Sequence, residues 1–119
     1  MRDHTKLHAF QLADRLAVAI YVQTRGFPRD ERFGLTAQLR RGAVSVASNI
    51  VEGCARSGEV DYVHYLGIAY AASREVEYQI SLAHRLSYLS PEQYEPLRAL
   101  SIETCKVLNG LIRALKDRL

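Results

Sequence analysis

Few side chains in this sequence have the types and spacing that metal binding requires. Asp61 and His64 form a single Asp-x-x-His pair, whereas a di-iron site in a helical bundle needs carboxylates on all four helices and two Glu-x-x-His pairs. His4 and His8 lie four residues apart, but two ligands do not make a stable site, and residues this close to a terminus are often frayed. We therefore expect a surface histidine pair, no bound metal and no other cofactor.

The sequence also lacks the motifs of nucleophilic and phosphate-transfer chemistry. It has no Gly-x-Ser-x-Gly motif, and the run EGCARSG at residues 52–58 contains two glycines but no lysine. Cys54 and Cys105 form no Cys-x-x-Cys pair and lie among apolar residues at helical spacing, which predicts buried thiols. A disulfide between them is the alternative, and it would require an oxidising compartment. These features predict a protein that is not an enzyme.

Arginine usage gives the clearest functional indication. Arginine outnumbers lysine thirteen to three. An arginine holds phosphate with two parallel hydrogen bonds and stacks on bases, which suits RNA, although a GC-rich genome would produce the same bias. If the chain binds nucleic acid, the expected phosphate contacts are Arg29, Arg32, Arg40, Arg41 and Arg56.

The charges are unevenly distributed along the chain. The formal net charge of +3 divides into +1 for residues 1–24, +3 for 25–58, −4 for 59–96 and +3 for 97–119. An acidic segment between basic ones suits either nucleic-acid binding or packing of the basic face of one copy against the acidic face of the next. A solvated surface with a mild dipole would show the same pattern, so charge alone does not decide.

Turn signals divide the chain into four segments of helical length. They lie at residues 25–28, 56–58 and 89–91. A chain of 119 residues fits one domain, here residues 1–119. Four helices joined by short loops must run antiparallel to their sequence neighbours, so the sequence predicts an all-α, up-down-up-down four-helix bundle.

Apolar periodicity assigns an inward face to each helix. The first helix should cover residues 7–24, the second should begin near Pro28, the third should cover 59–88, and a capping box should start the fourth at Ser90. The expected inward residues are Phe10, Ala13, Ala17, Ile20 and Tyr21, widened by Leu12 and Leu16, in the first helix; Leu35, Leu39, Ala43, Val46, Ile50 and Cys54 in the second; Tyr62, Leu66, Ala69, Ser73, Val76, Ile80 and Ala83 in the third; and Leu97, Leu100, Thr104, Leu108, Leu111 and Leu115 in the fourth.

No segment has the pattern of a membrane span or a secretory signal. The N-terminal run MRDHTKLHAF has charge but no apolar core. The longest stretch without Asp, Glu, Lys or Arg is Tyr62–Ser73, which is much shorter than the roughly 20 apolar residues of a spanning helix. We expect a cytoplasmic protein with no membrane partner and with reduced thiols.

The run RRGAVSVASNIVEG at residues 40–53 has small residues where a core helix would have large ones. Its second, polar face would allow close approach of another protein surface. We expect Arg40 or Arg41 to pair with Glu75 or Glu77 of a neighbouring copy. The full set of expected interface residues is Arg40, Arg41, Ser45, Asn49, Glu52, Glu75 and Glu77.

Two runs resemble a known family. FPRDERFGLTAQLRRGAVSVASNIVEGCAR (27–56) and DYVHYLGIAYAASREVEYQISLAHRLSYLS (61–90) resemble the "four helix bundle protein" family, which includes the proteins encoded in intervening sequences of 23S rRNA genes, or S23 proteins. They also resemble the accessory variability proteins of diversity-generating retroelements. The usual RRAAVSIPSNIAEG is changed at Gly42, Ala47 and elsewhere, and Phe10 stands where the family usually has Trp.

The resemblance implies an antiparallel four-helix bundle that assembles as a homopentameric ring around a central channel. It implies basic surfaces that bind nucleic acid and, in the retroelement members, contact with a reverse transcriptase. It implies no established enzymatic activity. Two hypotheses follow: an oligomeric nucleic-acid-binding accessory protein, or a scaffold whose ring assembly is the function. They compete for Arg40 and Arg41, because an arginine buried against a neighbouring subunit cannot also hold phosphate.

Overall fold

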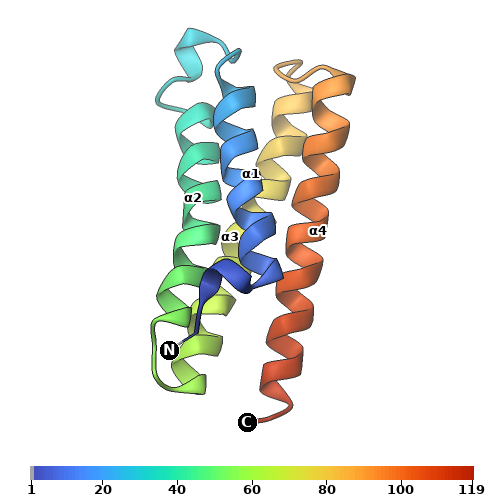
Figure 1. Ribbon diagram of the computed structural model, residues 1–119. Helices are drawn as coiled ribbons and strands as arrows, with labels where there is room; N and C mark the ends of the chain where they lie inside the picture. Colours follow the sequence, from blue (N-terminus) through green and yellow to red (C-terminus); the bar gives the residue numbers. More distant parts are fainter. Residues whose placement is uncertain (1) are drawn as a thin grey trace.

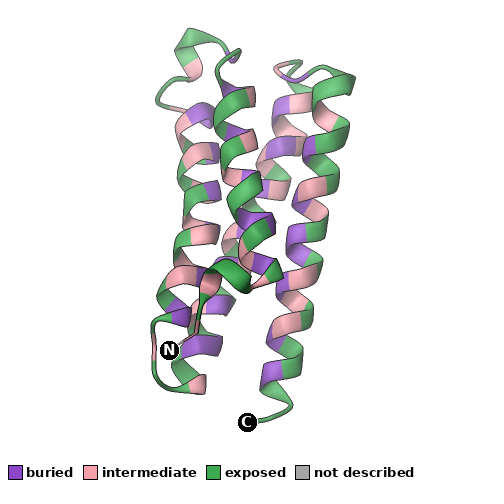
Figure 2. Cartoon of the chain, in the orientation of Figure 1, coloured by how far each residue is buried: buried purple, intermediate pink, exposed green. Residues whose placement is uncertain are grey.

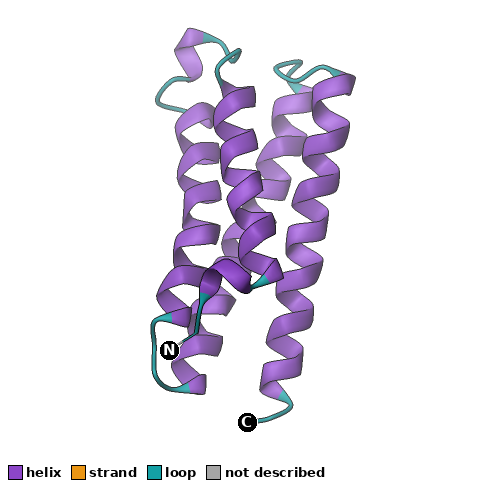
Figure 3. Ribbon diagram, viewed as in Figure 1, coloured by secondary structure: helices purple, strands orange, loops and turns teal. Residues whose placement is uncertain are grey.

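The computed structural model describes residues 2–119, which form four α-helices and two short 3₁₀ turns (Figures 1 and 3). In chain order these elements are η1 (His4–Lys6), α1 (His8–Thr24), η2 (Arg29–Glu31), α2 (Leu35–Cys54), α3 (Glu59–Arg85) and α4 (Pro91–Lys116). The described residues contain no strand. The expected all-α architecture of four helices is therefore confirmed.

The helices form an elongated antiparallel bundle of 45 × 23 × 20 Å. Each helix packs against its sequence neighbours, and α1 also packs against α4, so that α1 and α3 lie on one diagonal and α2 and α4 on the other (Figure 1). We call the end that carries residues 25–34 and 86–90 the upper end. The opposite end is the lower end, and it carries residues 2–7, the α2–α3 loop (55–58) and residues 117–119.

All four helices carry buried residues, alternating along each helix with exposed ones (Figure 2). Every residue expected on the inward faces of the second and third helices is buried. The capping box at Ser90 is also confirmed, with the Ser90 hydroxyl accepting from Gln93 N and the Gln93 side chain accepting from Ser90 N. Both cysteines are buried free thiols, as expected. Burial raises the pKa of each.

The expected inward faces of the first and fourth helices are confirmed only in part. On α1, Tyr21 is 42% exposed, and Ala9 and Thr24 are buried in addition to Leu12, Ala13, Leu16 and Ile20. The Tyr21 ring instead lies under the guanidinium of Arg40, 4.7 Å from its Cζ. On α4, Leu100 and Leu111 are only half-buried, and the buried positions beside Thr104 and Leu108 are Ser101, Cys105 and Ile112.

The second helix begins at Leu35 rather than near Pro28. Residues 29–31 form the separate turn η2, and the backbone of Gly34 (φ −104°, ψ −115°) is not helical. Glu31 therefore lies before the helix rather than in its first turn, and its Oε1 accepts a hydrogen bond from Leu35 N at 3.0 Å. The acidic side chain therefore satisfies the start of α2 from outside it, as a cap does.

Close packing of α2 on α3 depends on two glycines. A Cβ on Gly42 would lie 2.9 Å from Val76 Cγ2, and a Cβ on Gly53 would lie 3.2 Å from the backbone oxygen of Tyr62. Gly42 is one of the positions at which this chain departs from the usual family run. The structure gives this glycine a role, since it lets α2 approach Val76 of α3.

Candidate nucleic-acid interface

The turn between α1 and α2 is fastened to the rest of the bundle. Phe27 is buried and packs against Tyr88, with ring centroids 5.4 Å apart. Glu31 Oε2 accepts from the Tyr88 hydroxyl at 2.8 Å, while Oε1 accepts from Leu35 N. The hydrogen bond from the Leu35 amide, followed by that from Tyr88, holds the pKa of the Glu31 carboxyl below its ordinary value. The side chains of this turn are thus displayed from an anchored backbone.

Four arginines line one hollow at this turn. The hollow has a volume of about 290 Å³, and its walls are formed by Thr24, Arg25, Phe27, Pro28, Arg29, Arg32, Thr36 and Arg40. None of these lining residues is acidic. Four arginines around a hollow with no acidic lining residue favour a positive potential, which suits phosphate.

Arg40 reaches this hollow from α2 and is held by uncharged partners. Its Nε donates to Thr24 Oγ1 at 2.8 Å, and its Nη2 donates to the backbone oxygen of Tyr21 at 3.4 Å. The Thr24 hydroxyl donates in turn to the backbone oxygen of Ile20 at 2.7 Å. These contacts orient the guanidinium but leave its charge uncompensated.

The other three arginines of the hollow are exposed. Within residues 2–119, the ion pairs involve Arg56, Arg74 and Arg118, and therefore none of Arg25, Arg29, Arg32, Arg40 or Arg41. Arg32 also lies over the ring of Phe33, with its Cζ 5.3 Å from the ring centroid, and Phe33 is 85% exposed. The sequence analysis did not select Arg25, which lies in the turn signal at residues 25–28, or Phe33, which precedes Gly34.

Arg41 and Arg56 do not join this cluster. Arg41 lines two other hollows: a groove of about 710 Å³ on the α2–α3 side of the bundle, and a hollow of about 300 Å³ that it shares with Tyr21 and Arg40. Arg56 lies at the lower end, sixteen positions after Arg40, which corresponds to roughly 24 Å along a helix. It donates to Glu52 Oε1 at 3.0 Å and to the Tyr65 hydroxyl at 2.8 Å, and its Cζ lies 4.8 Å from the Tyr65 ring. Of the five arginines expected to bind phosphate, the structure brings Arg29, Arg32 and Arg40 together.

The residues expected at a subunit interface are distributed over several faces. Arg41, Ser45 and Glu75 line the α2–α3 groove together. Asn49 Nδ2 donates to the backbone oxygen of Ser45 at 2.8 Å, so the asparagine bonds within α2. Glu52 forms an ion pair with Arg56. Arg40, as described above, faces α1.

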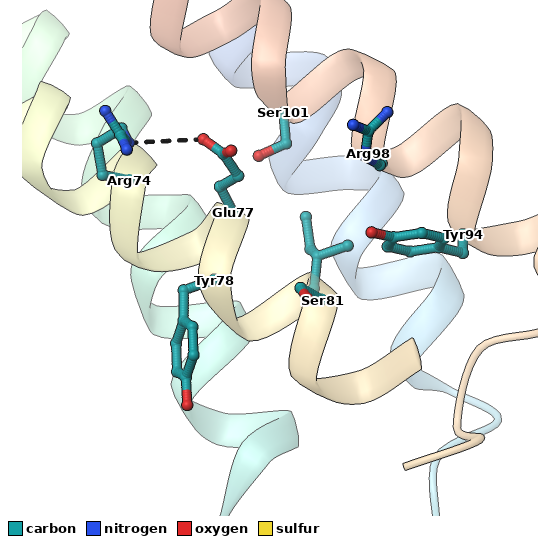
Figure 4. A pocket seen from close by; sticks show the side chains of 8 residues that line it. Arg74, Glu77, Tyr78, Ser81, Tyr94, Arg98 and Ser101 are labelled. Atoms are coloured by element: carbon teal, nitrogen blue, oxygen red, sulfur yellow. Dashed lines mark ion pairs between the residues drawn. The ribbon is translucent and has the colours of Figure 1, made fainter. Parts of the chain in front are cut away.

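Glu77 lines a different hollow, between α3 and α4, with a volume of about 310 Å³ (Figure 4). Glu77 Oε1 lies 3.6 Å from Arg74 Nε and accepts from Cys105 Sγ at 3.5 Å. Arg98 lines the same hollow. The carboxylate makes this site mixed in charge, so it suits phosphate less well than the four-arginine hollow does.

Among residues 2–119, no group of three or more His, Cys, Asp and Glu side chains is placed to hold a metal ion. In the same part of the chain, no helix combines the length and the apolar character needed to cross a membrane.

A family model and a solved structure relate this chain to the same protein family. The family model described as 23S rRNA-intervening sequence protein matches residues 5–110. A crystal structure of a protein of unknown function from the S23 ribosomal protein family of Bacteroides thetaiotaomicron is similar, with a TM-score of 0.80 and 27% sequence identity. The match covers 88% of this chain and 95% of that one. No curated protein matches this chain.

Proposed function

We propose that this chain, which belongs to the 23S rRNA-intervening sequence protein family, is a non-enzymatic RNA-binding protein that holds RNA phosphates at its upper end. The observation that carries the proposal is the hollow lined by Arg25, Arg29, Arg32 and Arg40 without an acidic residue in its walls. Arginine is suited to this role because its planar fork matches the oxygens of phosphate.

Residues 25–34 carry three arginines and two acidic residues, and Arg40 adds a fourth positive charge from α2. Asp30 and Glu31 are the acidic residues of η2. The carboxylate of Glu31 is already engaged by Leu35 N and Tyr88, so it competes only weakly for the arginines. The family is named for an intervening sequence of 23S rRNA, which makes RNA the first polyanion to test.

A binding titration tests this proposal. The anisotropy of a labelled RNA would be followed from about 50 to about 200 mM salt, a range over which phosphate-directed binding weakens steeply. The double variant Arg29→Glu with Arg32→Glu should abolish binding at the lower salt concentration. Arg15→Glu with Arg113→Glu is the matched control, because both residues are exposed, both lie outside the hollow, and the change in net charge is the same. No binding by the wild type, or equal loss in the two variants, would contradict the proposal.

A second candidate function, self-assembly, is favoured by the groove between α2 and α3. Small residues line it (Gly42, Ser45, Ala71 and Ala72), and Ile68 beside them is 39% exposed. The Oε1 atom of Gln79 is buried there without a hydrogen-bond partner among the described residues. Arg41 and Glu75 bring opposite charges to the same groove without forming an ion pair within the chain.

The proposed assembly is a homo-oligomer, in the ring of five subunits that the family resemblance implies. Sedimentation velocity tests it against the 13.4 kDa mass of a single chain. A monomer at micromolar concentration would refute self-assembly. A larger species that dissociates on Ala71→Arg, but not on Gly67→Arg at an exposed site on the same helix outside the groove, would support it.

A further inference from the structure

We infer that Phe33 is a stacking platform for an unpaired base, so that the upper end selects single-stranded or looped RNA over duplex RNA. The inference rests on the RNA binding proposed above and names the form of RNA that the site takes. Aromatic side chains stack on bases of any sequence, but only where the base is not already stacked within a duplex.

Phe33 is the most exposed of the large apolar side chains described. It is 85% exposed, whereas Phe27, six residues earlier in the same turn, is 9% exposed and packs on Tyr88. Burial of a phenylalanine side chain is strongly favourable. The exposed ring of Phe33, unlike that of Phe27, is therefore available for contact with a partner.

The charges around Phe33 indicate what that partner is. Arg32 both lies over the Phe33 ring and lines the four-arginine hollow, so the ring stands at the edge of the phosphate site. The separation of 5.3 Å between Arg32 Cζ and the ring centroid is too small for a base to enter between them. A base would stack on the opposite face of the ring while its phosphates lie against the arginines.

The backbone that carries Phe33 is anchored before RNA binds. Glu31, two positions earlier, accepts from Leu35 N and from Tyr88, while Phe27 is anchored in the core. An anchored backbone loses less conformational entropy when the ring stacks, which favours affinity.

Substitution of Phe33 separates stacking from charge. Phe33→Ala should weaken the binding of a single-stranded RNA by roughly 5- to 150-fold, the range observed for loss of one base–aromatic stack. It should leave the salt dependence and the weaker binding of a duplex RNA unchanged. Tyr78→Ala is the matched control, because Tyr78 is 60% exposed and also lies beside an arginine, Arg85, but far along the chain in the acidic segment.

A fluorescent variant gives an independent readout. The chain has no tryptophan, so Phe33→Trp would report on this position alone. Its fluorescence should be quenched by single-stranded RNA and not by duplex RNA, because only an unpaired base can stack on it.

The outcomes distinguish the inference from the function on which it rests. Equal binding of single-stranded RNA by Phe33→Ala and the wild type, or an unquenched Phe33→Trp with RNA bound, would overturn the inference and leave RNA binding intact. Absence of RNA binding by the wild type would overturn both. A fall in sedimentation coefficient on Phe33→Ala, with unchanged RNA affinity, would instead assign Phe33 to a contact with a second copy of the chain.

Discussion

The two ends of the bundle both carry arginines, but in opposite surroundings. At the lower end, Arg56 donates to Glu52 and Tyr65, and Arg118 contacts Glu59. Arg2 donates to the backbone oxygen of Arg56 and lies 3.9 Å from the ring centroid of Tyr62. These arginines hold the N-terminal residues, the α2–α3 loop and the C-terminus together.

At the upper end the arginines remain available. Arg25, Arg29 and Arg32 are exposed, and Arg40 is oriented by uncharged partners. The number of arginines therefore does not distinguish the two ends, whereas their hydrogen-bond and ion-pair partners do. The lower-end arginines are engaged within the fold, and the upper-end arginines are the ones proposed to bind a polyanion.

The largest expected effect is on RNA affinity. The triple substitution of Arg25, Arg29 and Arg32 by Ala should reduce the slope of log affinity against log salt by about 2, because each phosphate contact to a single strand contributes about 0.7. Near 0.1 M salt this corresponds to roughly 100-fold weaker binding. The salt titration measures it, and an unchanged slope would mean that these side chains do not contact phosphate.

The next effect is on the packing that closes the lower end. Gly53→Ala should destabilise the fold by about 1–3 kcal/mol, because the added Cβ would lie 3.1 Å from Tyr65 Cβ and 3.2 Å from the backbone oxygen of Tyr62. Urea denaturation measures the free energy of unfolding. Gly110→Ala is the control: nothing lies within 4 Å of its Cβ position, so it should stabilise α4 by up to about 1 kcal/mol. Equal effects of the two would refute the close α2–α3 contact.

Arg56→Ala should lower the free energy of unfolding by about 1–2 kcal/mol, because it removes the stacking contact and the hydrogen bond with Tyr65 and the exposed ion pair with Glu52. RNA affinity should change by less than about twofold, since Arg56 is already engaged. Arg29→Ala is the paired measurement, with a stability change within about 0.5 kcal/mol. If Arg56→Ala weakened RNA binding as much as Arg29→Ala, the two ends would not differ in function.

The smallest effect is a pH dependence at the upper end. The lowered pKa of Glu31 means that its contacts with Leu35 and Tyr88 stabilise the fold at neutral pH. This contribution is lost as pH falls from the ordinary value of 4.5 through the lower folded-state pKa. Glu31→Gln should therefore be slightly less stable than the wild type at pH 7, and the difference in thermal midpoint should shrink in acid. A constant difference at all pH values would exclude the ionic contribution.

Much of the fold could be predicted from the sequence because α2 and α3 each have one regular stripe of apolar residues at helical spacing. Every residue of those two stripes is buried, from Leu35 to Cys54 and from Tyr62 to Ala83. Periodicity was less complete on α1 and α4, where several neighbouring faces are similarly apolar: most expected residues are buried, but Tyr21 is exposed and Leu100 and Leu111 are only half-buried. There the rotation of the helix depends on long-range partners, such as the packing of Arg40 on Tyr21.

The candidate site was predicted only in part, for the same reason. Sequence spacing identified arginines but not their partners, so Arg29, Arg32 and Arg40 could not be distinguished from Arg56. The ion pair of Arg56 with Glu52 has a recognisable spacing of four, but its contact with Tyr65 joins two helices. Phe33 was not selected because it belongs to no helical stripe, and its exposure follows from the break between η2 and α2.

Hydrogen–deuterium exchange with and without a single-stranded RNA tests the central claim most directly, because it locates the bound RNA without altering the protein. The predicted result is added protection of backbone amides in residues 24–36, with no change in residues 52–65. Added protection confined to residues 52–65 and 113–119 would show that RNA binds at the lower end, and would contradict the assignment of the two ends.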